Sequence, residues 1–166
     1  PYYVTTPIIM KFLEENSGID VMVFMIQKEV AWRMAAQPGG KDYGALSVAV
    51  QYYSKPKKVM DVSPNCFIPK PEVDSTVIKL EVYSEPVVEV NDRSFFFKTI
   101  KAAFGQRRKT LVNALFNSGN FKKSKEEIQS ILENQGISPK QRGETLTIMQ
   151  FAELSNALLE KRLLKN

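Results

Sequence analysis

The chain has 166 residues, 43% of them apolar, which is enough for one domain or one domain and a fraction. It contains one cysteine, Cys66, and no histidine, which excludes an internal disulfide framework, histidine-based triads and most zinc sites. The longest apolar stretch, Val21–Ile26, is far too short to cross a membrane. We therefore expect a cytoplasmic protein with no bound metal and no membrane partner.

Charge is distributed unevenly along the chain, whose net charge is +5. Residues 1–91 carry 9 basic and 11 acidic side chains, a net charge of −2, whereas residues 92–166 carry 14 basic and 7 acidic ones, a net charge of +7. From Arg93 to Lys125, nine lysines and arginines occur without an acidic residue. One-signed charge at this density favours a polyanionic partner. The alternative is a solvated helix face.

Hydrophobic periodicity in the first half predicts helices and strands. Thr6 resembles a helix N-cap before Pro7, and an apolar helical stripe then continues toward Gly18. The continuous apolar run Val21–Ile26 is typical of a strand that is buried on both faces, as in a parallel sheet. The later segments are short helices over Val30–Ala36 and Leu46–Tyr53, a turn at Pro38-Gly39-Gly40, and strands over Lys57–Val62 and Ser75–Tyr83.

Beyond a linker between Ser84 and Asp92, the sequence is helical in period throughout. The expected helices are Phe95–Ala103 with Asp92 as its cap, Arg107–Phe116, one opened by the capping box Ser124–Glu127, and one opened by the box Thr147–Gln150. The predicted fold class is α/β followed by all-α, with residues 1–85 in the α/β part and residues 86–166 in a small basic helical domain. The α/β part has about three strands and no G-x-G turn, so it is incomplete as a nucleotide or cofactor fold.

A proline-rich segment before the last predicted strand carries one aromatic residue. Phe67 lies between Pro64 and the pair Pro69 and Pro71, which restrict the backbone without any packing. A rigid aromatic residue at the start of a strand is suited to stacking on a flat ligand such as a nucleobase. The alternative, which the residues alone favour, is a hydrophobic plug beneath the turn, because most phenylalanines are packing residues.

Several short motifs follow one another along the chain. They are Pro1-Tyr2, Gln27-Lys28-Glu29-Val30-Ala31-x-Arg33, Tyr43-Gly44-x-Leu46-Ser47-Val48, Phe67-x-Pro69-x-Pro71-x-Val73-Asp74-Ser75, Phe104-Gly105-Gln106-Arg107-Arg108-Lys109-Thr110-Leu111 and Gly136-Ile137-x-Pro139-x-x-Arg142-Gly143-Glu144-x-Leu146. In this order they resemble the ribosomal RNA adenine N6,N6-dimethyltransferase family, and within it the bacterial small-subunit branch linked to kasugamycin resistance. The resemblance covers essentially the whole chain.

The resemblance implies a class I methyltransferase that uses S-adenosylmethionine to dimethylate two adjacent adenosines in a small-subunit rRNA hairpin. Val21–Ile26, Lys57–Val62 and Ser75–Tyr83 would be strands five to seven of its sheet, the last two antiparallel. The family's cofactor-binding residues would precede Pro1, so we expect a fragment that binds no cofactor and is inactive by itself. Pro1, Tyr2 and Phe67 would be the catalytic residues that it retains, with Tyr2 and Phe67 stacking on the target base.

The resemblance also implies that the basic helical part binds rRNA in the immature small ribosomal subunit. The residues assigned to RNA are Lys98, Lys101, Arg107, Arg108, Lys109, Lys122 and Lys123. Arg107, Arg108 and Lys109 are expected at a helix start without acidic neighbours, and three phosphate contacts there predict a slope of log K against log salt of about −2. Arg142 and Glu144 are interpreted as a structural pair. The segment Gln27-Lys28-Glu29 either ends a buried strand or borders the active site.

Two other functions remain open at this point. One is a non-catalytic RNA-binding or ribosome-assembly module, since the basic helical part supports RNA binding with or without catalysis. The other is a large-subunit adenine methyltransferase of the erythromycin-resistance type, which matches the Arg107–Leu111 and Arg142–Leu146 patterns less well. Absence of the preceding strands would also expose one edge of Val21–Ile26, through which we expect the fragment to self-associate.

Overall fold

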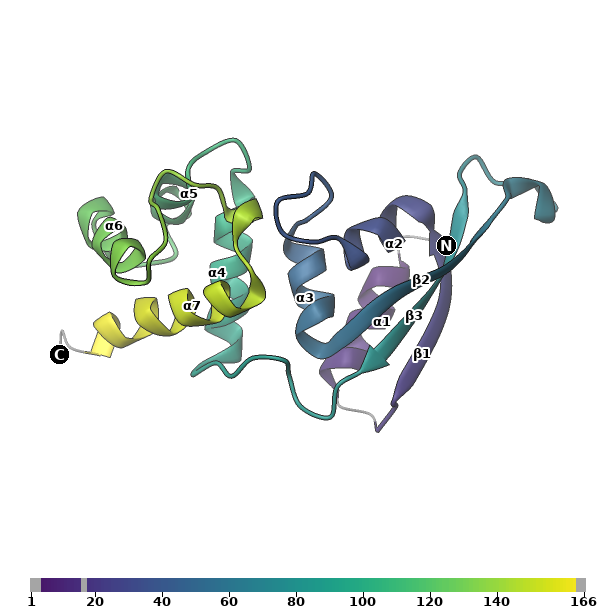
Figure 1. Cartoon of the computed structure of the whole chain (residues 1–166), viewed down its shortest axis with the longest axis horizontal. Coiled ribbons are helices and arrows are strands. Elements are labelled where there is room, and N and C mark those ends of the chain that lie inside the picture. Colours follow the sequence, from purple (N-terminus) through teal and green to yellow (C-terminus); the bar gives the residue numbers. More distant parts are fainter. Residues whose placement is uncertain (1–3, 16–17, 164–166) are drawn as a thin grey trace. The chain divides into compact units, whose positions relative to one another are not determined.

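The computed structural model of the chain describes residues 4–15 and 18–163. The chain divides into two compact units, coloured along the sequence in Figure 1. Unit 1 comprises Pro1–Gln37 and Asp42–Val87, and unit 2 comprises Pro38–Lys41 and Val88–Asn166. The short loop 38–41 thus belongs to the helical unit although it is flanked in sequence by unit 1, which the sequence did not indicate.

Unit 1 combines helices with an antiparallel sheet. Its elements are α1 (Thr5–Glu14), β1 (Val21–Gln27), α2 (Lys28–Ala35), α3 (Ala45–Tyr53), β2 (Ser54–Val62), the 3-10 helix η2 (Pro64–Cys66) and β3 (Ser75–Val82). Among the described residues the strand order is β1-β3-β2, and β3 is antiparallel to both neighbours. Figure 1 shows α1, α2 and α3 on one face of this sheet. On that side the core includes Ile78 and Leu80 of β3, while Lys79 and Glu81 are only partly covered, as the period-2 pattern predicts.

The prediction that the first strand is buried on both faces is wrong. Val21, Val23 and Met25 of β1 are 46%, 60% and 51% exposed, whereas Met22 and Ile26 are buried. The reason is that the described helices cover only one face of the sheet. Within the described chain β1 also lies at the sheet edge and pairs with β3 alone, in antiparallel orientation. The apolar run therefore identified a strand but not its surroundings.

The start of α1 also differs from its prediction. The helix begins at Thr5, so Thr6 is inside it and Pro7 is its third residue, and Val4 occupies the cap position without a side-chain cap. α1 ends at Glu14, and Gly18 adopts a positive φ of 68° beyond it. Its buried residues, Ile9 and Leu13, belong to the predicted apolar stripe. The stripe thus located the helix, whereas the cap motif placed its first residue wrongly.

Unit 2 is helical, with α4 (Arg93–Gly105), α5 (Leu111–Asn117), α6 (Lys125–Asn134), the 3-10 helix η3 (Gly143–Thr145) and α7 (Ile148–Leu163). Its core contains large apolar side chains from each α-helix: Phe96, Ile100, Leu111, Leu115, Ile128, Leu132, Phe151, Leu154 and Leu158. The phenylalanines near the start of α4 are therefore mainly packing residues. α4 contacts α5, α7 and η3, and α6 contacts α5 and α7.

Three predicted caps in unit 2 are confirmed. The Asp92 carboxylate accepts the Phe95 N–H at 2.8 Å at the start of α4. At α6, the Ser124 hydroxyl accepts the Glu127 N–H at 3.1 Å while the Glu127 carboxylate accepts the Ser124 N–H at 2.7 Å. The same reciprocal pair joins Thr147 and Gln150 at α7, at 3.2 and 2.9 Å. These contacts satisfy backbone donors that a helix leaves open at its first turn.

The predicted helix over Arg107–Phe116 is wrong at its start. The Lys109 N–H donates to the Gln106 carbonyl at 2.8 Å, which closes a turn after α4. Thr110 is extended, with ψ 155°, and α5 begins only at Leu111. The charged residues 107–109 consequently lie in a turn between two helices. No helix in the described ranges is long and apolar enough to cross a membrane.

Candidate functional site

The connection between β2 and β3 carries Phe67 and extends beyond the end of the sheet (Figure 1). Its first turn is η2, where the Ser63 hydroxyl accepts the Asn65 N–H at 3.3 Å. The Phe67 N–H then donates to the Pro64 carbonyl at 3.3 Å. Phe67 is partly exposed, and Ile68 beside it is fully exposed. Phe67 is therefore neither fully enclosed, as a plug would be, nor fully exposed.

The segment Gln27-Lys28-Glu29 contacts the base of this connection. Lys28 is the first residue of α2, and its N–H donates to the Asp74 carbonyl at 3.0 Å. Its ammonium lies 2.8 Å from the Asp61 carboxylate, which also accepts the Thr76 hydroxyl at 2.7 Å. Hydrogen bonds from Lys28 and Thr76 lower the pKa of Asp61, and the hydrogen bond to Asp61 raises the pKa of Lys28.

The sequence did not single out Asp61, and it noted Asp74 only within a motif. Their position in the sequence could have indicated a shared role, because Asp61 precedes the proline-rich segment and Asp74 follows it. Pro1 and Tyr2, the other predicted catalytic residues, lie outside the described residues. Phe67 is thus the predicted catalytic residue whose surroundings the structure describes.

The residues assigned to RNA lie in three places of unit 2. Lys98 and Lys101 are exposed on α4, three residues apart and therefore on one side of the helix. Arg107, Arg108 and Lys109 are exposed in the turn before α5. Lys122 is exposed and Lys123 partly buried in the segment between α5 and α6. The exposed members of the set are accessible to phosphate groups.

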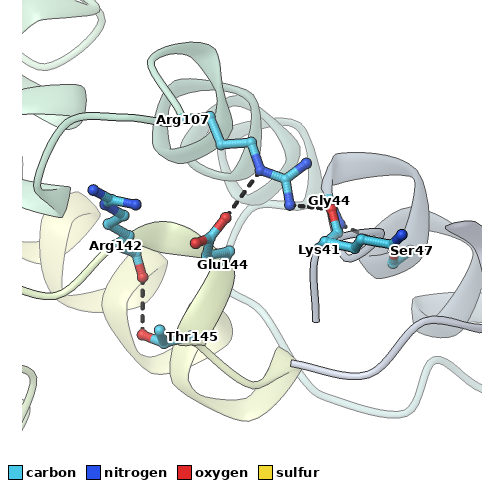
Figure 2. Close-up of polar contacts among 7 residues, drawn as sticks. All are labelled: Lys41, Gly44, Ser47, Arg107, Arg142, Glu144 and Thr145. Atoms are coloured by element: carbon cyan, nitrogen blue, oxygen red, sulfur yellow. Dashed lines mark hydrogen bonds and ion pairs between the residues drawn. The ribbon is translucent and has the colours of Figure 1, made fainter. Parts of the chain in front are cut away.

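Arg107 differs from its neighbours because it is held by internal contacts (Figure 2). Its Nε donates to the Glu144 carboxylate at 2.9 Å, and its guanidinium also donates to the Lys41 carbonyl. The expected helix start without acidic neighbours therefore does not hold for Arg107, because folding brings the distant Glu144 to it. The predicted pairing of Arg142 with Glu144 is wrong as well, because Glu144 pairs with Arg107 and the Arg142 carbonyl accepts the Thr145 hydroxyl. Glu144 is distant in sequence but lies on η3, which packs near the end of α4.

Gly143, also on η3, allows this close approach. A Cβ atom at Gly143 would lie 2.9 Å from the Ala103 carbonyl oxygen and 3.1 Å from the Ala103 Cβ. The adjacent Glu144 accepts the Gly39 N–H at its carbonyl, at 2.7 Å. Gly143 and Glu144 therefore connect the end of α4, the turn with Arg107 and the loop 38–41 within unit 2.

In the part of the chain that the structure describes, no group of three or more acidic or cysteine side chains is placed to hold a metal ion. Cys66 is exposed and free. The candidate functional features thus belong to separate units: an aromatic loop in unit 1 and a set of exposed cations in unit 2.

Comparison with known proteins identifies the family of this chain. A family model described as ribosomal RNA adenine dimethylase matches residues 1–154. The chain belongs to this family. It is 56% identical over 159 residues to the ribosomal RNA small subunit methyltransferase A of Anoxybacillus flavithermus, covering 95% of this chain and 54% of that protein. It is 54% identical over 164 residues to the protein of the same name from Bacillus cytotoxicus, covering 98% and 56% respectively.

Two solved structures resemble this chain in fold. A crystal structure of a dimethyladenosine transferase from Plasmodium falciparum matches with a TM-score of 0.79 and 27% identity, covering 98% of this chain and 64% of that one. The 23S rRNA methyltransferase ErmE shares the fold, with a TM-score of 0.64, 21% identity, and coverage of 95% and 62%. The predicted family and fold class are confirmed. The chain spans about half the length of the curated relatives that it matches.

Proposed function

We propose that this chain is part of an S-adenosylmethionine-dependent enzyme that dimethylates N6 of two adjacent adenosines in small-subunit rRNA. The observation that carries the proposal is its membership of the family together with identity above 50% to proteins named small-subunit methyltransferases. Its partner would be rRNA within the immature small subunit, in the cytoplasm. The 166 residues alone would bind no S-adenosylmethionine and show no activity, because they contain no Gly-rich cofactor turn.

Within that reaction, Phe67 would form one wall of the pocket for the extruded adenine. Methyl transfer to an exocyclic amine requires the base to be held in line with the methyl donor. A partly exposed ring on a proline-restricted loop is suited to this role, since it can stack on a base and has little freedom to lose. Tyr2, which follows Pro1 in the catalytic motif, would also stack on the base. S-adenosylmethionine would supply the methyl group.

The basic side chains of unit 2 would hold the rRNA backbone. Lys98, Lys101, Lys109, Lys122 and Lys123 would contribute together with Arg108, while Arg107 would act mainly through its contacts with Glu144 and the loop 38–41. Phosphate contacts of this kind give affinity and orientation without reading sequence. The same surface would serve a non-catalytic assembly module, so RNA binding by itself does not distinguish the two functions.

The experiment uses the full-length protein, small-subunit particles that lack the modification, and radiolabelled S-adenosylmethionine. We expect N6,N6-dimethyladenosine in the small-subunit RNA. Phe67→Ala should reduce transfer by about 5- to 150-fold, the range that corresponds to loss of one base–aromatic stack. Ile68→Ala, on the fully exposed neighbour, is the matched control and should have little effect.

The outcomes separate the alternatives. Methylation of large-subunit RNA instead would support the erythromycin-resistance type of enzyme. RNA binding without any transfer would support the assembly module. Equal activity of Phe67→Ala and wild type would leave the enzyme assignment intact but remove Phe67 from the target pocket. Binding of S-adenosylmethionine by the 166-residue chain in calorimetry would contradict its proposed inactivity.

We also propose that the 166-residue chain self-associates through β1. Among the described residues this strand pairs on one side only and exposes Val21, Val23 and Met25. Unpaired strand edges with apolar side chains favour pairing with another chain. Sedimentation should therefore detect association that Val23→Lys reduces, whereas a monomer at high concentration would oppose the proposal.

A further inference from the structure

Two carboxylates mark the two ends of the loop that carries Phe67. Asp61 precedes Val62, the last residue of β2, and Asp74 precedes Ser75, the first residue of β3. The strand ladder ends at the pair Val62–Ser75, so the residues between them form no ladder contact with β1 or β3. The direction in which this loop leaves the sheet therefore depends on how its two ends are fixed.

One lysine from a different element contacts both ends. The Lys28 ammonium lies 2.8 Å from the Asp61 carboxylate and 3.9 Å from the Asp74 carboxylate. Its backbone N–H donates to the Asp74 carbonyl at 3.0 Å. Lys28 is the first residue of α2 and follows β1 directly, so its backbone position is set by both elements. It consequently joins the end of β2, the entry to β3 and the start of α2.

The surroundings hold the ammonium in place. Its side chain is 33% exposed, and it lies 5.6 Å from the centroid of the Trp32 ring, one helical turn along α2. Lys58 lies over the same ring at 4.5 Å. The Thr76 hydroxyl donates to the second oxygen of Asp61 at 2.7 Å, which orients that carboxylate toward Lys28. This arrangement differs from the exposed pair Lys11–Glu15, which joins a residue of α1 only to the residue that follows the end of that helix.

We propose that Lys28 is a positioning residue that fixes both ends of the Phe67 loop and thereby aims the Phe67 ring. The prolines restrict the loop internally, but they do not set its orientation relative to the sheet. The ion pairs and the backbone hydrogen bond of Lys28 supply that orientation. The effect on methyl transfer rests on the proposed function, whereas the effect on the loop does not.

The first experiment measures the loop directly by amide hydrogen exchange in the 166-residue chain. Lys28→Met keeps the length of the side chain and removes its charge, and we expect exchange within residues 63–74 to become about fivefold faster. Lys28→Arg retains the charge and should exchange like wild type. The matched control is Lys58→Met, which removes a cation that lies over the Trp32 ring and attracts Asp61 without pairing with it, so the ion pairs of Lys28 remain and the effect on exchange should be smaller. Exchange in unit 2 should not change in any variant.

A second pair of variants covers the case in which Lys28→Met does not fold. Asp61→Asn and Asp74→Asn each weaken one contact and leave Lys28 in place, and each should accelerate exchange in the same loop. The single cysteine offers an independent reading, because a spin label at Cys66 reports motion beside Phe67. Unchanged exchange and an unchanged label in Lys28→Met, or equal changes in Lys58→Met, would overturn the proposal.

The third experiment asks whether Lys28 acts through Phe67 in the full-length enzyme. We expect Lys28→Met to lower kcat by about fivefold with little change in the KM for S-adenosylmethionine, and Lys28→Arg to restore it. In a Phe67→Ala background, Lys28→Met should cause no further loss, because both changes remove the same stacked geometry. Additive losses would overturn the positioning role. Absence of transfer by the wild type would refute the proposed function, while the exchange data would still decide the proposal on the loop.

Discussion

Replacement of Gly143 by alanine tests how closely η3 packs on α4. Gly143 is buried, and a Cβ atom there would lie 2.9 Å from the Ala103 carbonyl oxygen, closer than side chains normally approach a backbone atom. The nearest atoms are the carbonyl oxygen, the Cβ and the carbonyl carbon of Ala103, none of which can rotate away, so η3 and α4 must separate by a few tenths of an ångström. Insertion of extra atoms into a packed site usually costs about 1–3 kcal/mol. We expect the Gly143→Ala variant to lose that amount of unfolding free energy.

Gly105 provides a matched control, because alanine at this position should not lower the unfolding free energy. It is the last residue of α4, its backbone does not have a positive φ, and a Cβ atom there would meet nothing within 4 Å. Alanine is favoured over glycine in helices by about 0.5–1 kcal/mol, less at a terminus than in the interior. Gly105→Ala should therefore be neutral or slightly stabilising. Both changes add one methyl group to unit 2, so their difference isolates the steric contact.

The distribution of chromophores determines the assay. The single tryptophan, Trp32, and all six tyrosines belong to unit 1, so unit 2 contains neither. Urea unfolding is followed by far-ultraviolet circular dichroism, to which the helices of both units contribute, and by Trp32 fluorescence, which reports unit 1 alone. A change in the dichroism transition that Trp32 fluorescence does not share is then assigned to unit 2. Gly143→Ala should lower the midpoint and Gly105→Ala should not. A Gly143→Ala variant as stable as wild type, or equal losses in both variants, would refute the reasoning from close packing.

Three further predictions concern single side chains. Burial raises the pKa of Tyr43 from 10.0 to about 12, so the stability that the neutral phenol contributes is complete below pH 10 and is lost as the pH rises toward 12. Between pH 9 and 12 the wild type should therefore lose about 1–2 kcal/mol of unfolding free energy relative to Tyr43→Phe. A difference between the two proteins that stays constant with pH in urea unfolding would contradict this. Asp92→Ala removes the cap of α4 and should cost about 1 kcal/mol, measured by circular dichroism, whereas Asp92→Asn should restore most of it. Arg108→Gln should make the slope of log K against log salt for single-stranded RNA shallower by about 0.7, while Arg107→Gln should leave the slope nearly unchanged; equal effects would refute the distinction.

Local sequence patterns predicted the elements of this chain well because they reflect local physics. The capping boxes at Ser124 and Thr147, and the cap at Asp92, need only residues three positions apart. The alternation of buried and partly covered residues along β3 likewise follows from the two-residue period of a strand. The errors occur where the surroundings of an element are set by distant parts of the chain. The exposure of β1, for example, depends on which face of the sheet the helices cover. An apolar run alone does not carry that information.

The same limit applies to the candidate site. The sequence identified Phe67 from its prolines, but the contacts of Lys28 with Asp61 and Asp74 join residues more than thirty positions apart and follow from strand order. Nothing in the spacing of these residues indicates that one ammonium reaches both carboxylates. The sequence shows that the two carboxylates flank a proline-rich loop. Only the pairing of β2 with β3 shows that both carboxylates lie near the same point at the end of the sheet.

The run of basic residues in unit 2 illustrates why sequence charge and available charge differ. Arg107, Arg108 and Lys109 are adjacent, and their sequence neighbourhood lacks acidic residues, which suggested three equivalent phosphate contacts. Folding brings Glu144 to Arg107, so one of the three guanidinium or ammonium groups already has an internal partner. Two remaining contacts predict a slope of about −1.4 in place of about −2. Arg107 instead links η3 to the loop 38–41, so its loss should alter the shape of the turn that presents Arg108 and Lys109 more than the number of phosphates that they neutralise.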